Sequence, residues 1–264
     1  MSTPGARPAA RVPGVDLVRN PPGASDLVLL AHGGEEESLG NPHSWRPALL
    51  RMWPFAVAAR SAAPGAAVGF MRYRYRGWNA TAADRFDPPH PAARAVADPV
   101  VDLRAVLDQL PSVVRRVLLI GHSMGGRAVV AAGDHARVAG VLALAPWLPV
   151  GEPLVGLRAP VMFAHGADDT ITDPAATMAY AARVRAAGTP VRTYLLAGED
   201  HAMLHRSGDW NRLVADFIRS AQDSQELSGS QELPETNRGL QAATVGEIAL
   251  ARFRLPVRER FRVG

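Results

Sequence analysis

The stretch RVLLIGHSMGGRAVVAAGD at residues 116–134 decides the fold of this chain. An apolar run at 117–120 leads into the motif GHSMGG at 121–126, and a helix-forming sequence follows. A G-x-S-x-G motif between a strand and a helix is typical of a nucleophilic serine, because the sharp turn projects the hydroxyl out of the sheet. The helix start also presents a backbone N–H where an oxyanion can form. The motif therefore predicts Ser123 as a nucleophile and the Met124 N–H as an oxyanion donor.

Around this motif, apolar strand patterns alternate with helical patterns of ten or more residues. The alternation predicts βαβ units and a parallel sheet with helices on both faces, which is the α/β class. Strands are expected at residues 15–19, 27–31, 68–75, 116–121, 138–145, 161–165 and 191–197, and helices at 44–63, 98–110, 125–134, 174–187 and 209–221. Arg72, Arg74 and Arg76 alternate through and just past the third strand, which indicates a position near an edge or rim of the sheet.

A nucleophilic serine needs a general base, and the base needs an acid that orients it, so both are expected at later strand ends. The loop HGADDT at 165–170 follows one predicted strand, and GEDHAML at 198–204 follows another. The candidate acids and bases in and beside these loops are Asp168, Asp169, Asp173, His201 and His205. His201 is favoured as the base because it lies just past its strand end. The two histidines lack the glutamate of a zinc-protease motif and follow a strand, so we expect no metal.

An earlier strand supplies the remaining part of such a site. The run at 27–31 ends in AHGG at 31–34, between an early strand and the first helix, where a second oxyanion N–H is expected. With these motifs, residues 15–220 resemble the α/β-hydrolase superfamily, in particular its lidless serine hydrolases related to dienelactone-hydrolase and serine-aminopeptidase-like enzymes. The resemblance implies an α/β-hydrolase fold with a mostly parallel central sheet, helices on both faces and no inserted cap domain.

The resemblance also implies roles for individual residues. Ser123 would be the nucleophile, Asp169 the acid and His201 the base, because family loops of the form H-G-x-x-D favour Asp169. The backbone N–H groups of Met124 and Gly34 would bind the oxyanion. The implied activity is that of a serine esterase, which hydrolyses an ester-type bond through an acyl-enzyme on the serine. A thioesterase, an aminopeptidase-like hydrolase and a noncatalytic binding protein of the same fold are the alternatives.

Two tryptophans bear on the substrate. Trp78 and Trp147 each follow a predicted strand end, so they are candidates to line an apolar pocket, with simple packing as the alternative. Residues 146–160 are too few for a folded insertion, which indicates an open site suited to small soluble substrates rather than interfacial lipids. We therefore expect a small-molecule ester-type substrate.

Composition excludes several kinds of site and of partner. The chain contains no cysteine, which excludes disulfides, thiolate metal sites and a cysteine nucleophile. All 29 Lys+Arg residues are arginines, and the last 14 residues, with five Arg and one Glu, account for the whole formal excess of +4. The hydrolase segment is therefore close to neutral, and we expect no nucleic-acid partner.

The ends of the chain differ in character from its middle. Residues 1–14 are rich in Pro, Gly, Ala and Arg and predict a flexible lead without the apolar core of a secretory signal. Residues 15–222 are expected to form the hydrolase domain, and residues 223–264 a linker and an Arg-rich, disordered tail. We expect a cytoplasmic protein that needs no cofactor and does not associate with membranes.

Overall fold

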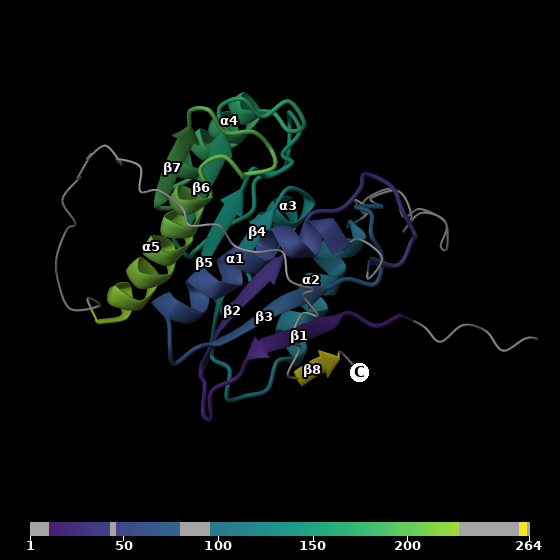
Figure 1. Cartoon of the computed structure of the whole chain (residues 1–264), viewed down its shortest axis with the longest axis vertical. Coiled ribbons are helices and arrows are strands. Elements are labelled where there is room, and N and C mark those ends of the chain that lie inside the picture. The colour runs from purple at the N-terminus through teal and green to yellow at the C-terminus, as the bar shows by residue number, and fades with distance from the viewer. Residues whose placement is uncertain (1–10, 43–45, 80–95, 227–258, 263–264) are drawn as a thin grey trace, which may run out of the picture.

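A computed structural model describes residues 11–42, 46–79, 96–226 and 259–262 of the chain. Its described residues form one sheet of eight strands in the order β7-β6-β5-β4-β2-β3-β1-β8 (Figure 1). The strands β2 to β7 run parallel, whereas β1 pairs antiparallel with β3, and β8 with β1. The strands are β1 Gly14–Arg19, β2 Asp26–Ala31, β3 Ala67–Arg72, β4 Arg116–His122, β5 Val138–Leu144, β6 Val161–Gly166, β7 Val191–Leu196 and β8 Glu259–Arg262.

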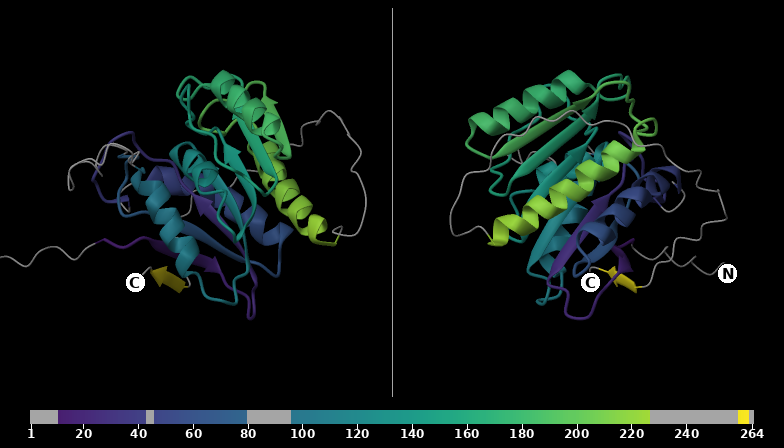
Figure 2. Two further views of the ribbon diagram at one scale, coloured as in Figure 1. Left: turned by 180° about the vertical axis from the view of Figure 1, so that it is seen from behind. Right: turned by 60° about the vertical axis from the view of Figure 1, so that its left-hand side comes forward.

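Helices cover both faces of this sheet (Figure 2), so the predicted α/β class is confirmed. One face carries α1 (Arg46–Ala62) and α5 (Ser207–Glu226), and the other carries α2 (Asp98–Gln109), α3 (Met124–Ala131) and α4 (Pro174–Ala186). None of the helices in the described ranges combines the length and the apolar character that a membrane crossing requires.

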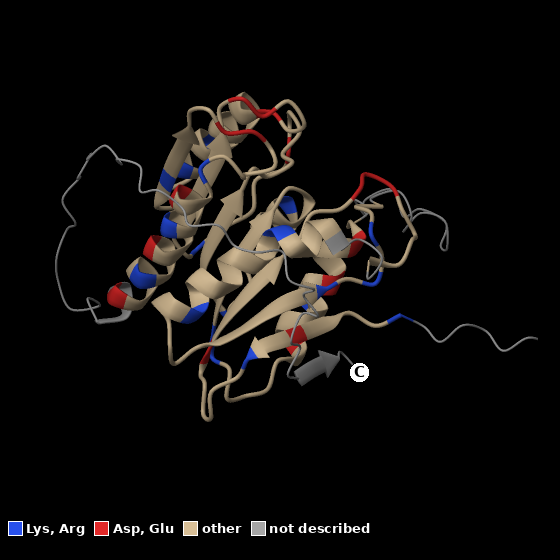
Figure 3. Ribbon diagram, in the orientation of Figure 1, with Lys and Arg blue, Asp and Glu red and all other residues tan. Residues whose placement is uncertain are grey.

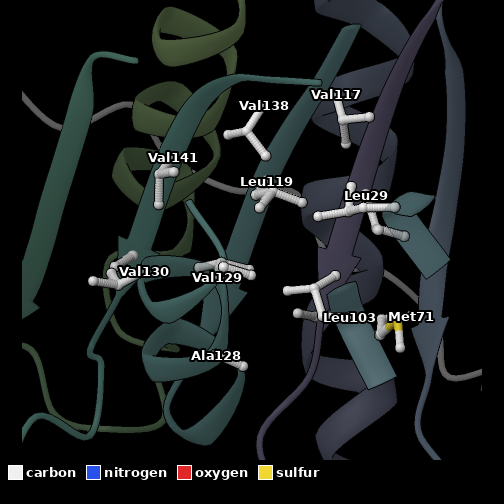
Figure 4. Packing of buried hydrophobic residues seen from close by; sticks show 14 of the residues in the cluster. Leu29, Met71, Leu103, Val117, Leu119, Ala128, Val129, Val130, Val138 and Val141 are labelled. Atoms are coloured by element: carbon white, nitrogen blue, oxygen red, sulfur yellow. The ribbon is translucent and has the colours of Figure 1, made fainter. Parts of the chain in front are cut away.

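The two core layers explain the continuous apolar runs in the sequence. Along β4, Val117 and Leu119 belong to the layer under α2, α3 and α4, whereas Leu118 and Ile120 belong to the layer under α1 and α5. Figure 4 shows the first layer, where Leu29, Leu119 and Val129 lie close together between strands and helices. A central parallel strand is buried on both faces, so its sequence is a nearly continuous apolar run. These buried strands place their carboxyl ends side by side.

The third strand differs from its predicted position. We expected it near an edge or rim because of its alternating arginines, but β3 lies between β2 and β1 and all its residues are buried. Only Arg72 lies within β3 and is buried, whereas Arg74 and Arg76 follow the strand and are partly exposed; carboxylates neutralise all three. Arg72 pairs with Asp16 on the neighbouring strand, and Arg74 pairs with Asp102 on α2. The prediction was wrong because the sequence does not show that β1 and β8 extend the sheet beyond β3.

Much of the predicted lead and tail lies outside the described residues. Within the described part, Gly14 already begins β1, α5 continues to Glu226, and residues 259–262 form β8. In the β1–β8 register, Asp16 stands opposite Arg260. The sequence did not predict this strand, and the proposed division into lead, domain and tail stays a prediction. Residues 145–160, between β5 and β6, contain no helix or strand, so no cap domain is inserted there.

We expect Gly125→Ala to destabilise the fold by about 3 kcal/mol or more, because the added Cβ overpacks a backbone contact. That Cβ would lie 2.2 Å from the carbonyl oxygen of Ala31, so α3 could not pack against the end of β2. Gly208→Ala is the matched control at another helix start, since nothing lies within 4 Å of its Cβ position. It should leave the free energy of unfolding unchanged or raise it by about 0.5 kcal/mol. Urea denaturation measures both, and equal stabilities of the two variants would contradict this packing.

Candidate active site

Ser123 lies on a strained turn between β4 and α3. Its backbone adopts φ 57° and ψ −120°, a conformation that residues with a Cβ rarely adopt. The turn closes because glycines flank the serine: a Cβ on Gly121 would lie 2.2 Å from the carbonyl oxygen of Gly125. The Ser123 residue is 8% exposed. The predicted serine is therefore held at the carboxyl end of the sheet, at the start of a helix.

Asp169 lies in the loop after β6, and its side chain is 0% exposed. Its Oδ1 accepts the backbone N–H groups of Ile171 and Thr172 at 2.8 and 2.9 Å. Its Oδ2 accepts from His201, His165 and the Thr172 hydroxyl, at 2.8, 3.0 and 2.8 Å. Burial alone would raise the pKa of Asp169, but the side-chain hydrogen bonds, foremost from His165 and His201, hold it well below its usual range. Asp169 is therefore an ionised carboxylate that only accepts hydrogen bonds.

His201 follows β7, and 13% of its side chain is exposed. Because the carboxylate of Asp169 has no proton, the 2.8 Å hydrogen bond requires Nδ1 of His201 to be the donor. The Nε2 atom then keeps its lone pair in the neutral ring, which is the tautomer that a general base needs. Within the described residues His201 makes no hydrogen bond with Ser123. Such bonds commonly tighten only when substrate binds.

The other predicted candidates lie elsewhere. Asp168 is exposed and Asp173 caps α4, where its side chain accepts the N–H of Ala175 at 2.8 Å. His205 is exposed, four residues beyond His201 in a loop that is not helical. The geometry thus favours Asp169 and His201 among the alternatives that the sequence left open. Among the described residues, no group of three or more His, Cys, Asp and Glu side chains has an arrangement that could hold a metal ion.

The two predicted oxyanion donors lie next to each other. A Cβ on Gly34 would lie 2.5 Å from the sulfur of Met124, so the loop after β2 contacts the first residue of α3. Within the described residues, neither the Gly34 nor the Met124 N–H donates a hydrogen bond. His32 bonds through Nδ1 to the carbonyl oxygen of Gly33 at 2.7 Å. Because the peptide group is planar and trans, this bond turns the Gly34 N–H the opposite way and leaves it free to donate.

His122 precedes the serine and packs against His201. It is 2% exposed, the two ring centroids are 4.7 Å apart, and its Nε2 donates to the carbonyl oxygen of His201 at 3.1 Å. Burial lowers the pKa of His122 well below its ordinary value, and the neighbouring charges of His201 and Arg51 act in the same direction. His122 is therefore neutral, and it ties the loop that carries His201 to the end of β4.

The β7–α5 loop is also anchored from its other side. Glu199 is 0% exposed and accepts the indole N–H of Trp210 at 2.8 Å. A Cβ on Gly166 would lie 2.3 Å from the carbonyl oxygen of Glu199, so the segments that lead to Asp169 and His201 are in direct contact. A cavity of about 270 Å³ lies between this loop and α1, and Phe55 and Met203 are among the residues that line it.

Trp78 and Trp147 meet edge to face, and one arginine contacts both rings. Their ring centroids are 6.1 Å apart, and the guanidinium of Arg127 lies 4.1 Å from the Trp78 ring and 4.7 Å from the Trp147 ring. Arg127 is also held by Glu152 through two hydrogen bonds of 3.0 and 2.6 Å. The backbone N–H of Trp147 donates to the carbonyl oxygen of Ser123 at 3.1 Å. The backbone of Trp147 therefore lies beside the Ser123 turn, and contact of either ring with substrate stays a prediction.

Sequence reasoning missed several residues that support the site. Arg127 lies one helical turn after Ser123, and this spacing could have predicted that its side chain lies near the serine. Thr172, three residues after Asp169, is the kind of short polar residue that hydrogen-bonds within a turn. His165, at the end of the strand before the Asp169 loop, hydrogen-bonds to Asp169 itself. Glu152 carried no signal, because only the folded loop brings it to Arg127.

Comparison with known proteins adds to this geometry. The alpha/beta hydrolase family matches the sequence over residues 28–239, which is more than half of the chain. No curated protein matches the sequence.

Solved structures of the same architecture are also similar. A sugar hydrolase (YeeB) from Lactococcus lactis has 14% sequence identity and a TM-score of 0.56, over 85% of this chain and 98% of that chain. Est1E from Butyrivibrio proteoclasticus has 15% identity and a TM-score of 0.51, over 80% and 94%. An alpha-beta serine hydrolase homologue from Coxiella burnetii has 16% identity and a TM-score of 0.51, over 73% and 84%. At these identities the likeness shows a common fold.

The buried, neutral His122 predicts how stability depends on pH. Its pKa is lowered in the folded protein, whereas the unfolded chain binds a proton near 6.5, so stability is complete above 6.5 and falls as the pH decreases below it. His122→Gln keeps a donor and removes the titration. Its free energy of unfolding should fall less steeply towards low pH than the wild type's, by up to about 1.4 kcal/mol per pH unit. Urea denaturation from about pH 8 to about pH 5 measures this, and parallel curves would contradict a buried neutral ring.

Proposed function

The chain belongs to the alpha/beta hydrolase family, and on this premise we propose that it is a serine hydrolase that cleaves an ester-type bond of a small soluble substrate. The observation that carries the proposal is the 2.8 Å hydrogen bond from His201 Nδ1 to the buried Asp169, at the same sheet edge as the strained Ser123 turn. That bond orients the ring and leaves Nε2 as the base, which is the arrangement that activates a serine hydroxyl.

The proposed reaction has two halves. In the first, Nε2 of His201 takes the Ser123 proton while Oγ attacks the ester carbonyl carbon, and the Met124 and Gly34 N–H groups bind the oxyanion. The tetrahedral intermediate collapses, His201 gives the proton to the leaving alkoxide oxygen, and the alcohol departs from an acyl-enzyme. In the second half, His201 takes a proton from water while the water oxygen attacks the acyl carbon. His201 then returns that proton to the Ser123 oxygen as the carboxylic acid product is released.

Charge near the site favours neutral substrates. Glu36, Glu37 and Asp168 are exposed on the loops after β2 and β6, at the edge of the sheet where Ser123 lies. Figure 3 shows these acidic segments around the carboxyl ends of the strands. A negative rim repels anionic ligands, so polyanionic thioesters such as acyl-coenzyme A are disfavoured and uncharged esters are favoured. The uncapped segment at 145–160 supports a small soluble substrate.

Ser123→Ala should lower kcat for hydrolysis of p-nitrophenyl acetate or butyrate by at least about 10⁴-fold, because the acyl-enzyme cannot form. Ser112→Ala is the matched control, since Ser112 is exposed just before the amino end of β4, at the opposite edge of the sheet. It should retain wild-type kcat and KM. Full activity of Ser123→Ala in this spectrophotometric assay would refute the proposal.

The tryptophan pair predicts how the acyl group is selected. Trp147→Leu should raise KM for long acyl chains or alter the chain-length preference by about 10-fold, because removal of an aromatic wall reshapes an apolar pocket. Trp53→Leu is the matched control: Trp53 stacks on Phe70 in the α1 layer, with ring centroids 5.9 Å apart. Its chain-length profile across p-nitrophenyl esters should match the wild type. If the two variants gave the same profile, Trp147 would be a packing residue only.

A further inference from the structure

His165, at the end of β6, hydrogen-bonds to the same carboxylate oxygen of Asp169 as the proposed base His201. The residue is 0% exposed. Its Nε2 lies 3.0 Å from Asp169 Oδ2 and 3.1 Å from the hydroxyl of Thr172, and its Nδ1 lies 2.9 Å from the hydroxyl of Thr177 on α4. The same Oδ2 atom receives the hydrogen bond from His201 Nδ1. Two imidazole rings therefore share one carboxylate oxygen.

The proton positions follow from the acceptor. Ionised Asp169 cannot donate, so Nε2 of His165 must carry a proton and donate to Oδ2. In a neutral ring Nδ1 then accepts the hydroxyl proton of Thr177, which fixes both the tautomer and the plane of the ring. The single hydroxyl proton of Thr172 goes to Oδ2 at 2.8 Å, its shortest contact. Both ring nitrogens of His165 are thereby hydrogen-bonded within a buried network.

We propose that His165 is a positioning residue, which fixes the Asp169 carboxylate and limits how strongly that carboxylate attracts a proton on His201. This inference rests on the proposed function, in which His201 is the base. The carboxylate divides its acceptor capacity among three side-chain donors on Oδ2. A charge-assisted hydrogen bond from His165 stabilises the negative charge and makes the oxygen a weaker acceptor for His201. The base thus stays neutral, and able to take a proton, at lower pH.

Other charged and titratable groups also surround the base. Besides Asp169, His201 faces His122 from the end of β4, and Arg51 from α1 donates to its carbonyl oxygen at 3.5 Å. Glu199, from the β7–α5 loop, packs its backbone against Gly166 of β6. Replacing His165 substitutes none of these groups. A difference between wild type and a His165 variant therefore reports the loss of the His165 contacts to Asp169, Thr172 and Thr177.

His165→Leu removes the donor and should have two measurable effects. The pKa of His201 should rise, which moves the acidic limb of kcat/KM up by about half a pH unit or more, since the carboxylate regains acceptor strength. The value of kcat on p-nitrophenyl butyrate should fall by about 10-fold while KM stays unchanged, because the acid is less firmly held. His165→Gln keeps an N–H donor and should restore the limb most of the way to its wild-type position.

Two further variants complete the design. Thr177→Val removes the hydroxyl that holds Nδ1 of His165 and should shift the limb in the same direction by less, which keeps the proposal testable if His165→Leu fails to fold. His135→Leu is the matched control, because His135 forms another His–Asp pair, 3.0 Å from Asp108 and remote from the site. That variant should leave the limb unchanged.

An NMR titration of the His201 ring, assigned by comparison with His201→Gln, provides a readout that needs no turnover. A raised His201 pKa in His165→Leu, with rescue in His165→Gln, supports the proposal. An unchanged pKa and limb, together with lower stability, would overturn it and leave His165 as a structural residue. If the ring pKa rises but wild-type hydrolysis does not depend on Ser123, the proposed function fails while the coupling of His165 to His201 stands.

Discussion

The site depends on one constraint, the strained backbone of Ser123 between β4 and α3. A φ of 57° at a residue with a Cβ is stable only where the surroundings leave no alternative. Here Gly121 and Gly125 close the turn, and Gly125 also lets α3 approach the end of β2. The same approach brings Gly34 to Met124, so the turn and the proposed pair of oxyanion donors depend on the same packing contact.

Asp169, the proposed acid, is the second residue on which the site depends. Asp169 combines two backbone donors on Oδ1 with three side-chain donors on Oδ2, so its position and its charge are both fixed. More donors hold a carboxylate more firmly but weaken it as an acceptor for each partner. In the proposal, the hydrogen bond that His165 donates to the oxygen shared with His201 is a compromise between these two effects. A base that stays neutral over a wider pH range is the expected benefit.

Local sequence predicted the parts of the site that local structure builds. The strand, serine and helix are contiguous, and so are the strand ends that carry Asp169 and His201, so periodicity and motif spacing located them. What the sequence did not predict arises between distant segments. The Arg127–Glu152 pair, the pairing of β8 with β1 and the interior position of β3 depend on which surfaces meet after folding. The hydrogen bond from His165 to Asp169 was not predicted for the same reason.

The central claim, that Ser123 is the nucleophile, can be tested directly by covalent labelling. Treatment with a fluorophosphonate, tryptic digestion and mass spectrometry is the measurement, and the chain suits it, because cleavage after Arg116 and Arg127 releases a peptide, residues 117–127, whose only hydroxyl side chain is Ser123. The account predicts one phosphonate adduct per chain on this peptide, and none after Ser123→Ala. An adduct on another peptide, or no adduct on the native protein, would contradict it.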